Sequence, residues 1–377
     1  MRKFAWRDCL VVAVVGVTAC AAAAGLAQEA GKSGESNPKT AAQQFKNIQI
    51  LKDIPAEQLI PTMQFISASL GVECEFCHVE HQMDKDDKKE KKVARSMIEM
   101  QLAIDRDHFK GDLEVTCYTC HRGAAHPVGT PLLSADANAK RPAPHTHEPA
   151  GDTHASLPTA EQLLDKYLAA VGGADALRKI KTRVQKGTIE AMGTQSPIEI
   201  YSEAPDKRVS VSHLNGGSSV TAFNGQAGWL TFPGGVHRMT TAERESARID
   251  ADLYFAADAR ELYKEFRVRP GEEVDGKATY LVGATANPGH PAIRMYFDQE
   301  SGLLLRLIRY TETALGRNPA QVDYADYRVT DGVKIPYRWT LARPNGAFAI
   351  KIEQVQQNGP VDQKLFEPPA ENPPPSH

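Results

Sequence analysis

The sequence predicts a multidomain protein in which a mainly α module precedes an α+β domain with a curved antiparallel sheet, a half-barrel. Between residues 40 and 130, two helix-like segments are each followed by the same cysteine–histidine pattern. Residues 131–157 are rich in proline, alanine and small polar residues, which is typical of a linker. Residues 158–370 contain a series of strand-like segments. We therefore expect two folded parts joined by the linker.

The first 27 residues have the pattern of a secretory signal peptide. A basic start precedes an apolar run from Leu10 to Ala24, and the tripeptide GLA then gives a small-x-small cleavage site. An alternative signal ends at Cys20, because VTAC fits the lipoprotein pattern in which that cysteine is lipidated. Both alternatives place the protein in the periplasm, and the second also anchors its N-terminus to the membrane.

The chain of 377 residues has a formal net charge of −3, which argues against a nucleic-acid-binding surface. Its six cysteines include only Cys9 and Cys20 outside two short motifs. Each motif is Cys-x-x-Cys-His, a pattern typical of c-type haem attachment through two thioether bonds, with the histidine as the proximal iron ligand. The predicted attachment residues are Cys74, Cys77, Cys117 and Cys120, and the predicted proximal ligands are His78 and His121.

Two other chemistries use paired cysteines. Zinc ribbons separate their cysteine pairs by about 15–20 residues. The interval from Cys77 to Cys117 is far longer, and zinc does not require a histidine at the same offset in both copies. A redox dithiol of the thioredoxin type needs a βαβ context, which this stretch lacks. The sequence therefore favours two covalently bound haem c groups.

The segments before the motifs predict two amphipathic helices. In residues 55–71, Leu59, Met63, Ile66 and Leu70 recur at helical spacing, and Gly71 marks the end. In residues 91–109 the corresponding apolar positions are Val93, Met97, Met100 and Ile104. The module is thus a duplicated unit of helix, turn and haem motif.

A methionine on such a helix can be core filling or the sixth ligand of a haem iron. Met63, Met97 and Met100 are the candidate thioether ligands. The competing histidine ligands are His81, His108 and His126.

The stretch FKNIQILKDIPAEQLIPTMQFISASLGVECEFCH, followed by ARSMIEMQLAID and VTCYTCHRG, resembles the cytochrome c subunit of photosynthetic reaction centres. That family carries four haems, whereas this chain has two motifs and so resembles half of the subunit. The resemblance implies that Met63 is the distal ligand of the first haem. It also implies that Met97, the first methionine of an R-x-M-x-x-M helix, serves the second haem, with Met100 as the alternative.

The C-terminal part predicts a helix over 159–180, seven strand-like segments and a second helical stretch over 242–266. FDQESGLLLR and YRVTDGVKIPYRW predict hairpins. The pattern resembles the half-barrel of the outer-membrane lipoprotein carriers, the Lol family. We expect Trp229 and Trp339 to pack against the sheet, whose concave face could hold an apolar ligand.

These observations predict a periplasmic or membrane-anchored dihaem cytochrome c that transfers electrons between redox protein partners, rather than an enzyme. One alternative is a dihaem peroxidase or oxidase, which would need an open or exchangeable iron position. Another is a lipid-, quinone- or lipoprotein-binding protein in which the haem module is accessory. The C-terminal part contains no recognisable catalytic constellation.

Overall fold

The computed structural model describes residues 39–127, 157–191, 193–214, 217–233, 235–286, 291–344 and 346–369. The predicted signal peptide, Cys20 and all of the predicted linker except Leu157 lie outside these residues. The described residues all belong to one compact unit, Lys39–His377. Across the described ranges, no helix combines the length and the apolar character needed to cross a membrane.

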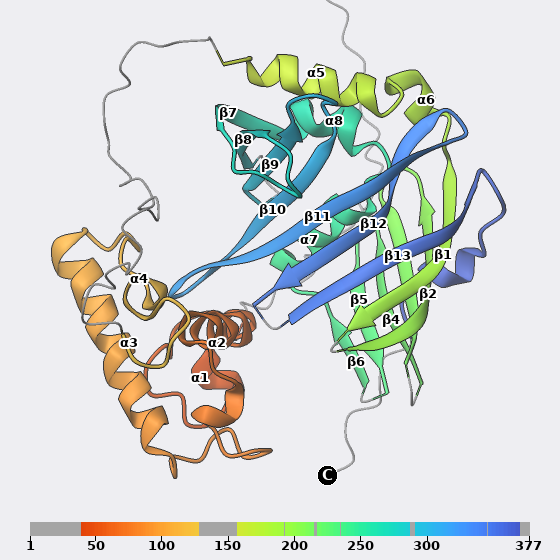
Figure 1. Cartoon of the computed structure of the whole chain (residues 1–377). Helices are drawn as coiled ribbons and strands as arrows, with labels where there is room; N and C mark the ends of the chain where they lie inside the picture. The colour runs from red at the N-terminus through yellow and green to blue at the C-terminus, as the bar shows by residue number, and fades with distance from the viewer. Residues whose placement is uncertain are drawn as a thin grey trace, which may run out of the picture. The chain divides into compact units, whose positions relative to one another are not determined.

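Residues 39–127 contain short and long helices (Figure 1). These are α1 (Ala41–Gln44), α2 (Ala56–Leu70), the 3₁₀ turn η1 (Cys74–Phe76), α3 (Lys89–His108) and α4 (Cys117–His121). The two predicted helices are confirmed as α2 and α3. Gly71 ends α2 in the left-handed conformation, with φ of 65°, as its position predicted.

All thirteen strands that the structure describes form one antiparallel sheet, which confirms the predicted sheet. It consists of two meanders, β6 to β1 and β13 to β7, joined where β1 pairs with β13. The first meander contains β1 (Thr182–Ala191), β2 (Thr194–Glu203), β3 (Lys207–Leu214), β4 (Gly217–Asn224), β5 (Gly228–Phe232) and β6 (Gly235–Arg238). The second contains β7 (Tyr263–Pro270), β8 (Thr279–Ala286), β9 (Ile293–Asp298), β10 (Leu304–Thr313), β11 (Gly316–Thr330), β12 (Val333–Arg343) and β13 (Gly346–Gln357).

Both predicted hairpins are confirmed. FDQESGLLLR forms the turn from β9 to β10, and YRVTDGVKIPYRW forms the turn from β11 to β12. In the second turn Asp331 and Gly332 both have positive φ, 48° and 81°, as a two-residue type I′ hairpin requires. Local turn chemistry alone was therefore sufficient to predict these two strand pairs.

Each of the two helical stretches predicted in the C-terminal part forms two helices and not one continuous helix, so the prediction was wrong on this point. Residues 159–180 form α5 (Ala160–Ala170) and α6 (Ala174–Arg178), separated at Gly172 and Gly173, whose φ angles are 115° and 82°. A right-handed helix cannot continue through that backbone. The stretch 242–266 forms α7 (Thr241–Ala251) and α8 (Phe255–Leu262), and its last residues belong to β7.

The main core lies between the sheet and these helices. The sheet curves around α7, and α5 and α6 lie at one end of the strands (Figure 1). Leu163, Ile200, Met295 and Leu307 are among the buried residues of this core. Arg309 on β10 is 1 % exposed, and its Nη1 and Nη2 atoms each donate to one carboxylate oxygen of Asp250 on α7, at 2.6 Å. This bidentate pair fixes α7 to the sheet.

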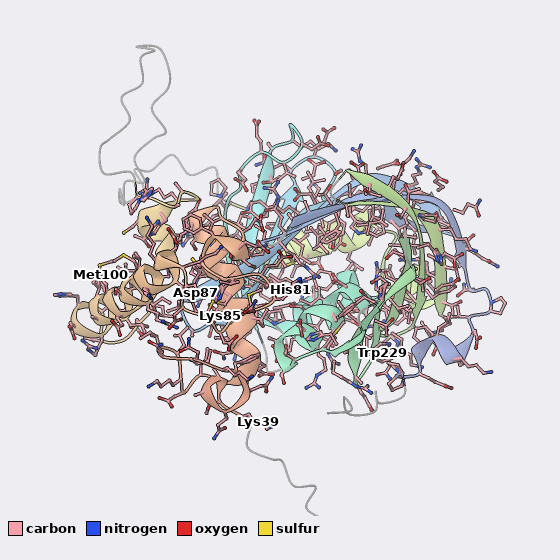
Figure 2. All side chains as sticks on the ribbon, turned by 90° about the horizontal axis from the view of Figure 1, so that it is seen from below. Lys39, His81, Lys85, Asp87, Met100 and Trp229 are labelled. Carbon is pink, nitrogen blue, oxygen red and sulfur yellow. The ribbon has the colours of Figure 1, made fainter. Side chains whose placement is uncertain are left out.

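The two tryptophans lie in different surroundings. Trp229 is 2 % exposed and packs with Val209, Ala222 and Phe366 in a smaller core, which confirms its predicted packing role (Figure 2). Trp339 packs against the main core but also lines a cavity of about 790 Å³.

The turn between β10 and β11 contacts the helices of residues 39–127. Leu315 is fully buried against Phe65 of α2 and Ile98 of α3. Asn318 donates from Nδ2 to the backbone oxygen of Pro61 at 2.7 Å, and Gln101 donates from Nε2 to the backbone oxygen of Leu315 at 3.4 Å. A small apolar cluster with two hydrogen bonds therefore joins the helices to the sheet.

Gly187 is required where the two meanders join. The register of β1 on β13 shifts between Lys186 and Gly187, and a Cβ atom at Gly187 would lie 2.0 Å from the backbone oxygen of Lys351. Because the obstructing atom is backbone, it cannot rotate away. The absence of a side chain at this position lets the two strands approach each other.

We predict that Gly187→Ala lowers the free energy of unfolding by about 1–3 kcal/mol, because the added methyl group forces β1 and β13 apart. The matched control is Gly283→Ala on β8, where the nearest atom to a new Cβ is 4.0 Å away. Urea unfolding followed by circular dichroism measures both variants. Equal effects of the two substitutions would contradict the steric explanation.

Candidate functional site

The two Cys-x-x-Cys-His motifs form one short helical turn each. Cys74 begins η1 and Cys77 follows its end, while Cys117 and Cys120 both lie in α4. Residues three apart lie on the same side of a 3₁₀ or α turn, so each motif presents both thiols in one direction. The backbone N–H of Gly123 donates to the oxygen of Ser69 at 2.9 Å, which holds the end of the second motif against α2. Both motifs therefore adjoin the C-terminal half of α2.

Both motif histidines are oriented by a backbone carbonyl. His78 Nδ1 lies 2.9 Å from the oxygen of Met83, and His121 Nδ1 lies 2.9 Å from the oxygen of Ala124. A carbonyl oxygen only accepts hydrogen bonds, so Nδ1 carries the proton in each ring. The lone pair of each neutral ring is then on Nε2, the state that a metal-binding histidine needs.

A charged network supports the carbonyl that orients His78. Lys91 on α3 donates from Nζ to the oxygen of Met83 at 2.8 Å and also lies 3.1 Å from Asp86 Oδ1. Arg95 binds both oxygens of Asp86, at 2.8 and 3.0 Å, and Asn47 donates to Oδ1 at 3.0 Å. Hydrogen bonds from Arg95, Asn47 and Lys91 hold the pKa of Asp86 well below its usual range. The loop after the first motif is thus fixed to α3.

One thiol of each motif has a raised pKa. Cys117 donates from Sγ to Gln101 Oε1 at 3.3 Å, and burial raises its pKa to about 11. Burial, with a smaller contribution from the negative charge of Glu90, also raises the pKa of Cys77. A reactive dithiol depends on a lowered thiol pKa, and both shifts go the other way.

The candidate methionines differ in exposure. Met63 is half-buried on α2, whereas Met97 and Met100 on α3 are 41 % and 48 % exposed. Figure 2 labels Met100. The predicted apolar face of α3 therefore faces outward, and its buried residues are instead Lys91, Ile98, Gln101 and Asp105. On α2 the buried residues include Phe65, which the predicted face omitted. The core therefore uses another face of α3 than the one that carries Met97 and Met100. On α2 the predicted face is partly used, because Leu59 is buried and Ile66 packs against the Phe65 cluster.

Large exposed apolar side chains are concentrated in residues 39–127. Nine of the twelve in the described part of the chain lie there: Ile60, Phe76, Met83, Val93, Met97, Met100, Phe109, Leu113 and Tyr118. Together with the thiol pairs and the oriented histidines, this surface fits two haem groups, each of which is large, flat and apolar. Cys74, Cys77 and His78 would hold one haem, and Cys117, Cys120 and His121 the other.

The described ranges contain no cluster of three or more histidine, cysteine, aspartate or glutamate side chains arranged to hold a metal ion. The rival histidines His81, His108 and His126 are all exposed.

Several supporting residues carry no recognisable sequence signal. Gln101 contacts both Cys117 and the turn at Leu315, but a single glutamine inside a helix predicts neither contact. Asp86 and Lys91 belong to a run of mixed charges that is usually a solvated surface. Only the folded loop shows that these two side chains support His78.

Comparison with known proteins supports the first resemblance. The family model described as the photosynthetic reaction centre cytochrome C subunit matches residues 13–195. The corresponding subunit of Thermochromatium tepidum is 33% identical over 95 residues, which are 24% of this chain and 24% of that protein. The subunit of Rubrivivax gelatinosus is 33% identical over 94 residues, which are 23% of this chain and 25% of that protein. The predicted resemblance is confirmed, and the chain spans about a quarter of the length of these relatives.

The sheet-containing part is similar to solved structures at low sequence identity. A LolA superfamily protein from Nitrosomonas europaea is 13% identical, with a TM-score of 0.39 over 56% of this chain and 99% of that chain. A DUF1329 family protein from Desulfovibrio piger is 14% identical, with a TM-score of 0.39 over 55% of this chain and 96% of that chain.

We predict that Asp86→Ala loosens the loop that orients His78, because it removes the acceptor shared by Arg95, Asn47 and Lys91. The depressed pKa means that this stabilisation is complete above the ordinary carboxyl value near 3.8 and is lost as the pH falls towards the lower pKa of the folded protein. At pH 7 the variant should therefore be cut faster by proteases within residues 79–88.

The matched control is Asp87→Ala, which removes an exposed neighbouring carboxylate (Figure 2). Limited proteolysis followed by mass spectrometry compares the two variants with the parent. The supporting role of Asp86 fails if both variants are cut at the parental rate.

Proposed function

We propose that this protein is a dihaem c-type cytochrome that transfers electrons between redox partners in the periplasm or at the membrane. The observation that carries the proposal is the pair of motif histidines, His78 and His121, whose Nδ1 atoms are each bonded to a backbone carbonyl. That arrangement leaves Nε2 of each ring available to an iron. In each motif the oriented histidine follows two cysteines that lie on one side of a helical turn. The similarity to reaction-centre cytochrome c subunits supports the same assignment.

In this proposal residues 40–130 form a mainly α dihaem module, and residues 158–370 form a separate half-barrel domain. The haems supply the redox chemistry when bound, and the chain sets their potentials through axial ligands and burial. Gln101 lies between α4 and the turn at Leu315, so it couples the second motif to the sheet.

Met63 and Met97 are the proposed distal ligands, with Met100 as the alternative to Met97. Support comes from α3, whose buried residues occupy other positions than Met97 and Met100, so that this methionine face is available to a haem. Met63 on α2 is half-buried. Because thioether ligation raises a haem potential and closes the iron to small molecules, it favours electron transfer over the peroxidase or oxidase alternative.

The haem content tests the first part of the proposal. The chain expressed with the c-type maturation machinery should retain two covalent haems after denaturation, measured by pyridine haemochrome absorbance per mole of protein. Cys74→Ala combined with Cys77→Ala should leave one, because the second motif is unaffected. A parent protein that carries zinc, or no covalent haem, would contradict the assignment.

The distal ligands are tested by substitution. Met63→Ala should lower the potential of one haem and allow it to bind carbon monoxide, because a sixth ligand is lost. Met97→Ala should do the same at the other haem, while Met100→Ala serves as the control on the same exposed face. Optical spectra and redox titrations provide the measurement. A change with Met100→Ala but not with Met97→Ala would transfer the role to Met100.

A further inference from the structure

Lys91 is a buried cation connected to the proposed iron ligand His78. The residue is 8 % exposed, and its Nζ atom donates to the backbone oxygen of Met83 at 2.8 Å. The same oxygen lies 2.9 Å from His78 Nδ1. A carbonyl oxygen has two lone pairs, so it accepts both hydrogen bonds at once. Two hydrogen bonds in series therefore connect the ammonium group to the histidine ring.

The charge of Lys91 is only partly compensated by the carboxylate beside it. Asp86 Oδ1 lies 3.1 Å from Lys91 Nζ, but Arg95 binds both oxygens of Asp86, at 2.8 and 3.0 Å. Two cations thus share one carboxylate, and the three side chains together keep a net positive charge. Water and salt screen a buried charge less than an exposed one, so its effect on a neighbouring group is larger.

Other charges near the first motif oppose one another. Burial raises the pKa of Cys77, and beyond burial Glu90 raises this pKa while Lys88 lowers it. The exposed charges around the motif are also of both signs, and water and salt screen them. They include Glu80, Asp87, Lys85 and Lys89. The buried excess charge at Lys91 is therefore the distinctive electrostatic feature of this motif.

The second motif has the same histidine geometry without such a cation. His121 Nδ1 lies 2.9 Å from the backbone oxygen of Ala124. Within the described ranges, no lysine or arginine side chain donates to that oxygen, and the adjacent Arg122 is exposed. The two motifs thus share one hydrogen-bond arrangement and differ in the cation that joins it.

A cation at this place favours the reduced iron for two reasons. Reduction adds one electron, from Fe(III) to Fe(II), so the positive charge that the cation repels becomes smaller. The carbonyl that Lys91 shares is also a weaker acceptor for the Nδ1 proton, so His78 becomes a weaker electron donor to the iron. Both effects raise the reduction potential.

We propose that Lys91 is a positioning residue that acts through Met83 and His78 and raises the reduction potential of the haem on the first motif relative to that on the second. The inference rests on the proposed haem assignment. The electron comes from a redox partner of the proposed function, and no bond forms or breaks. The shift favours electron transfer from the second haem to the first.

Redox titration at pH 7 of the full chain with both haems attached tests the proposal. The variant with Cys74→Ala and Cys77→Ala retains only the second haem, so it shows which of the two potentials belongs to the first. Lys91→Met removes the charge at similar side-chain length. It should make reduction of the first haem about tenfold less favourable, a fall of about 59 mV for one electron, and leave the second haem unchanged.

Asp86→Asn separates the effect of charge from support of the loop. It removes the negative charge that Lys91 and Arg95 share and keeps an oxygen acceptor, so it should raise the first potential, in the direction opposite to Lys91→Met. A purely structural role would move the potential in the same direction in both variants, because both loosen the same loop. Lys91→Arg should retain the parental potential. Lys92→Met is the matched control, because Lys92 is exposed.

The possible outcomes separate this proposal from the haem assignment. If both haems are present, an unchanged first potential in Lys91→Met overturns the role of Lys91, as does a shift in the same direction as in Asp86→Asn. A parent chain without covalent haem overturns the proposed function and this inference together. Should Lys91→Met fail to fold, Asp86→Asn decides, because a rise of the first potential supports the proposal and a fall or no change contradicts it.

Discussion

The pairing of β1 with β13 is the constraint on which the sheet depends. Each meander is built from local antiparallel neighbours, and only this pair joins them. The junction is tight enough to require a residue without a side chain at Gly187. Because the meanders are joined, the sheet can curve around α7, and Arg309 of the second meander can reach Asp250 of that helix. Both meanders, α7 and parts of α2, α5, α6 and α8 line the cavity.

The helices of residues 39–127 are organised differently, because little of their apolar surface is buried by protein. Their small cluster with Leu315 covers the faces that carry Phe65 and Ile98, while Met63 remains half-buried and Met97 and Met100 remain exposed. Only a few apolar side chains of this segment, among them Leu59, Phe65 and Ile98, are buried by protein. A large apolar prosthetic group would cover the remaining surface, which is the physical link between the proposed haems and the fold of this part of the chain.

The helices of residues 39–127 meet the sheet-containing part at the cavity and near the second motif. Pro61 and Gln64 of α2, on either side of Met63, line the same cavity as Arg183 and Arg208. Gln101 bonds to Cys117 on one side and to the β10–β11 turn on the other. The helix that carries a proposed iron ligand is therefore also part of the cavity wall, and short hydrogen-bonded connections link the second motif to the sheet.

The sequence by itself determined the features that depend on neighbouring residues. These are the two Cys-x-x-Cys-His motifs, helices α2 and α3, the stop at Gly71 and the hairpins at Gly302 and Gly332. Their signals are local spacing and turn chemistry, so they could be predicted without a structure. The break at Gly172, the outward orientation of Met97, and the support of His78 by Asp86 and Lys91 could not be predicted in this way. These features depend on how the folded backbone brings side chains together, so only the tertiary structure decided which strands pair, which helix face is buried and which charges meet.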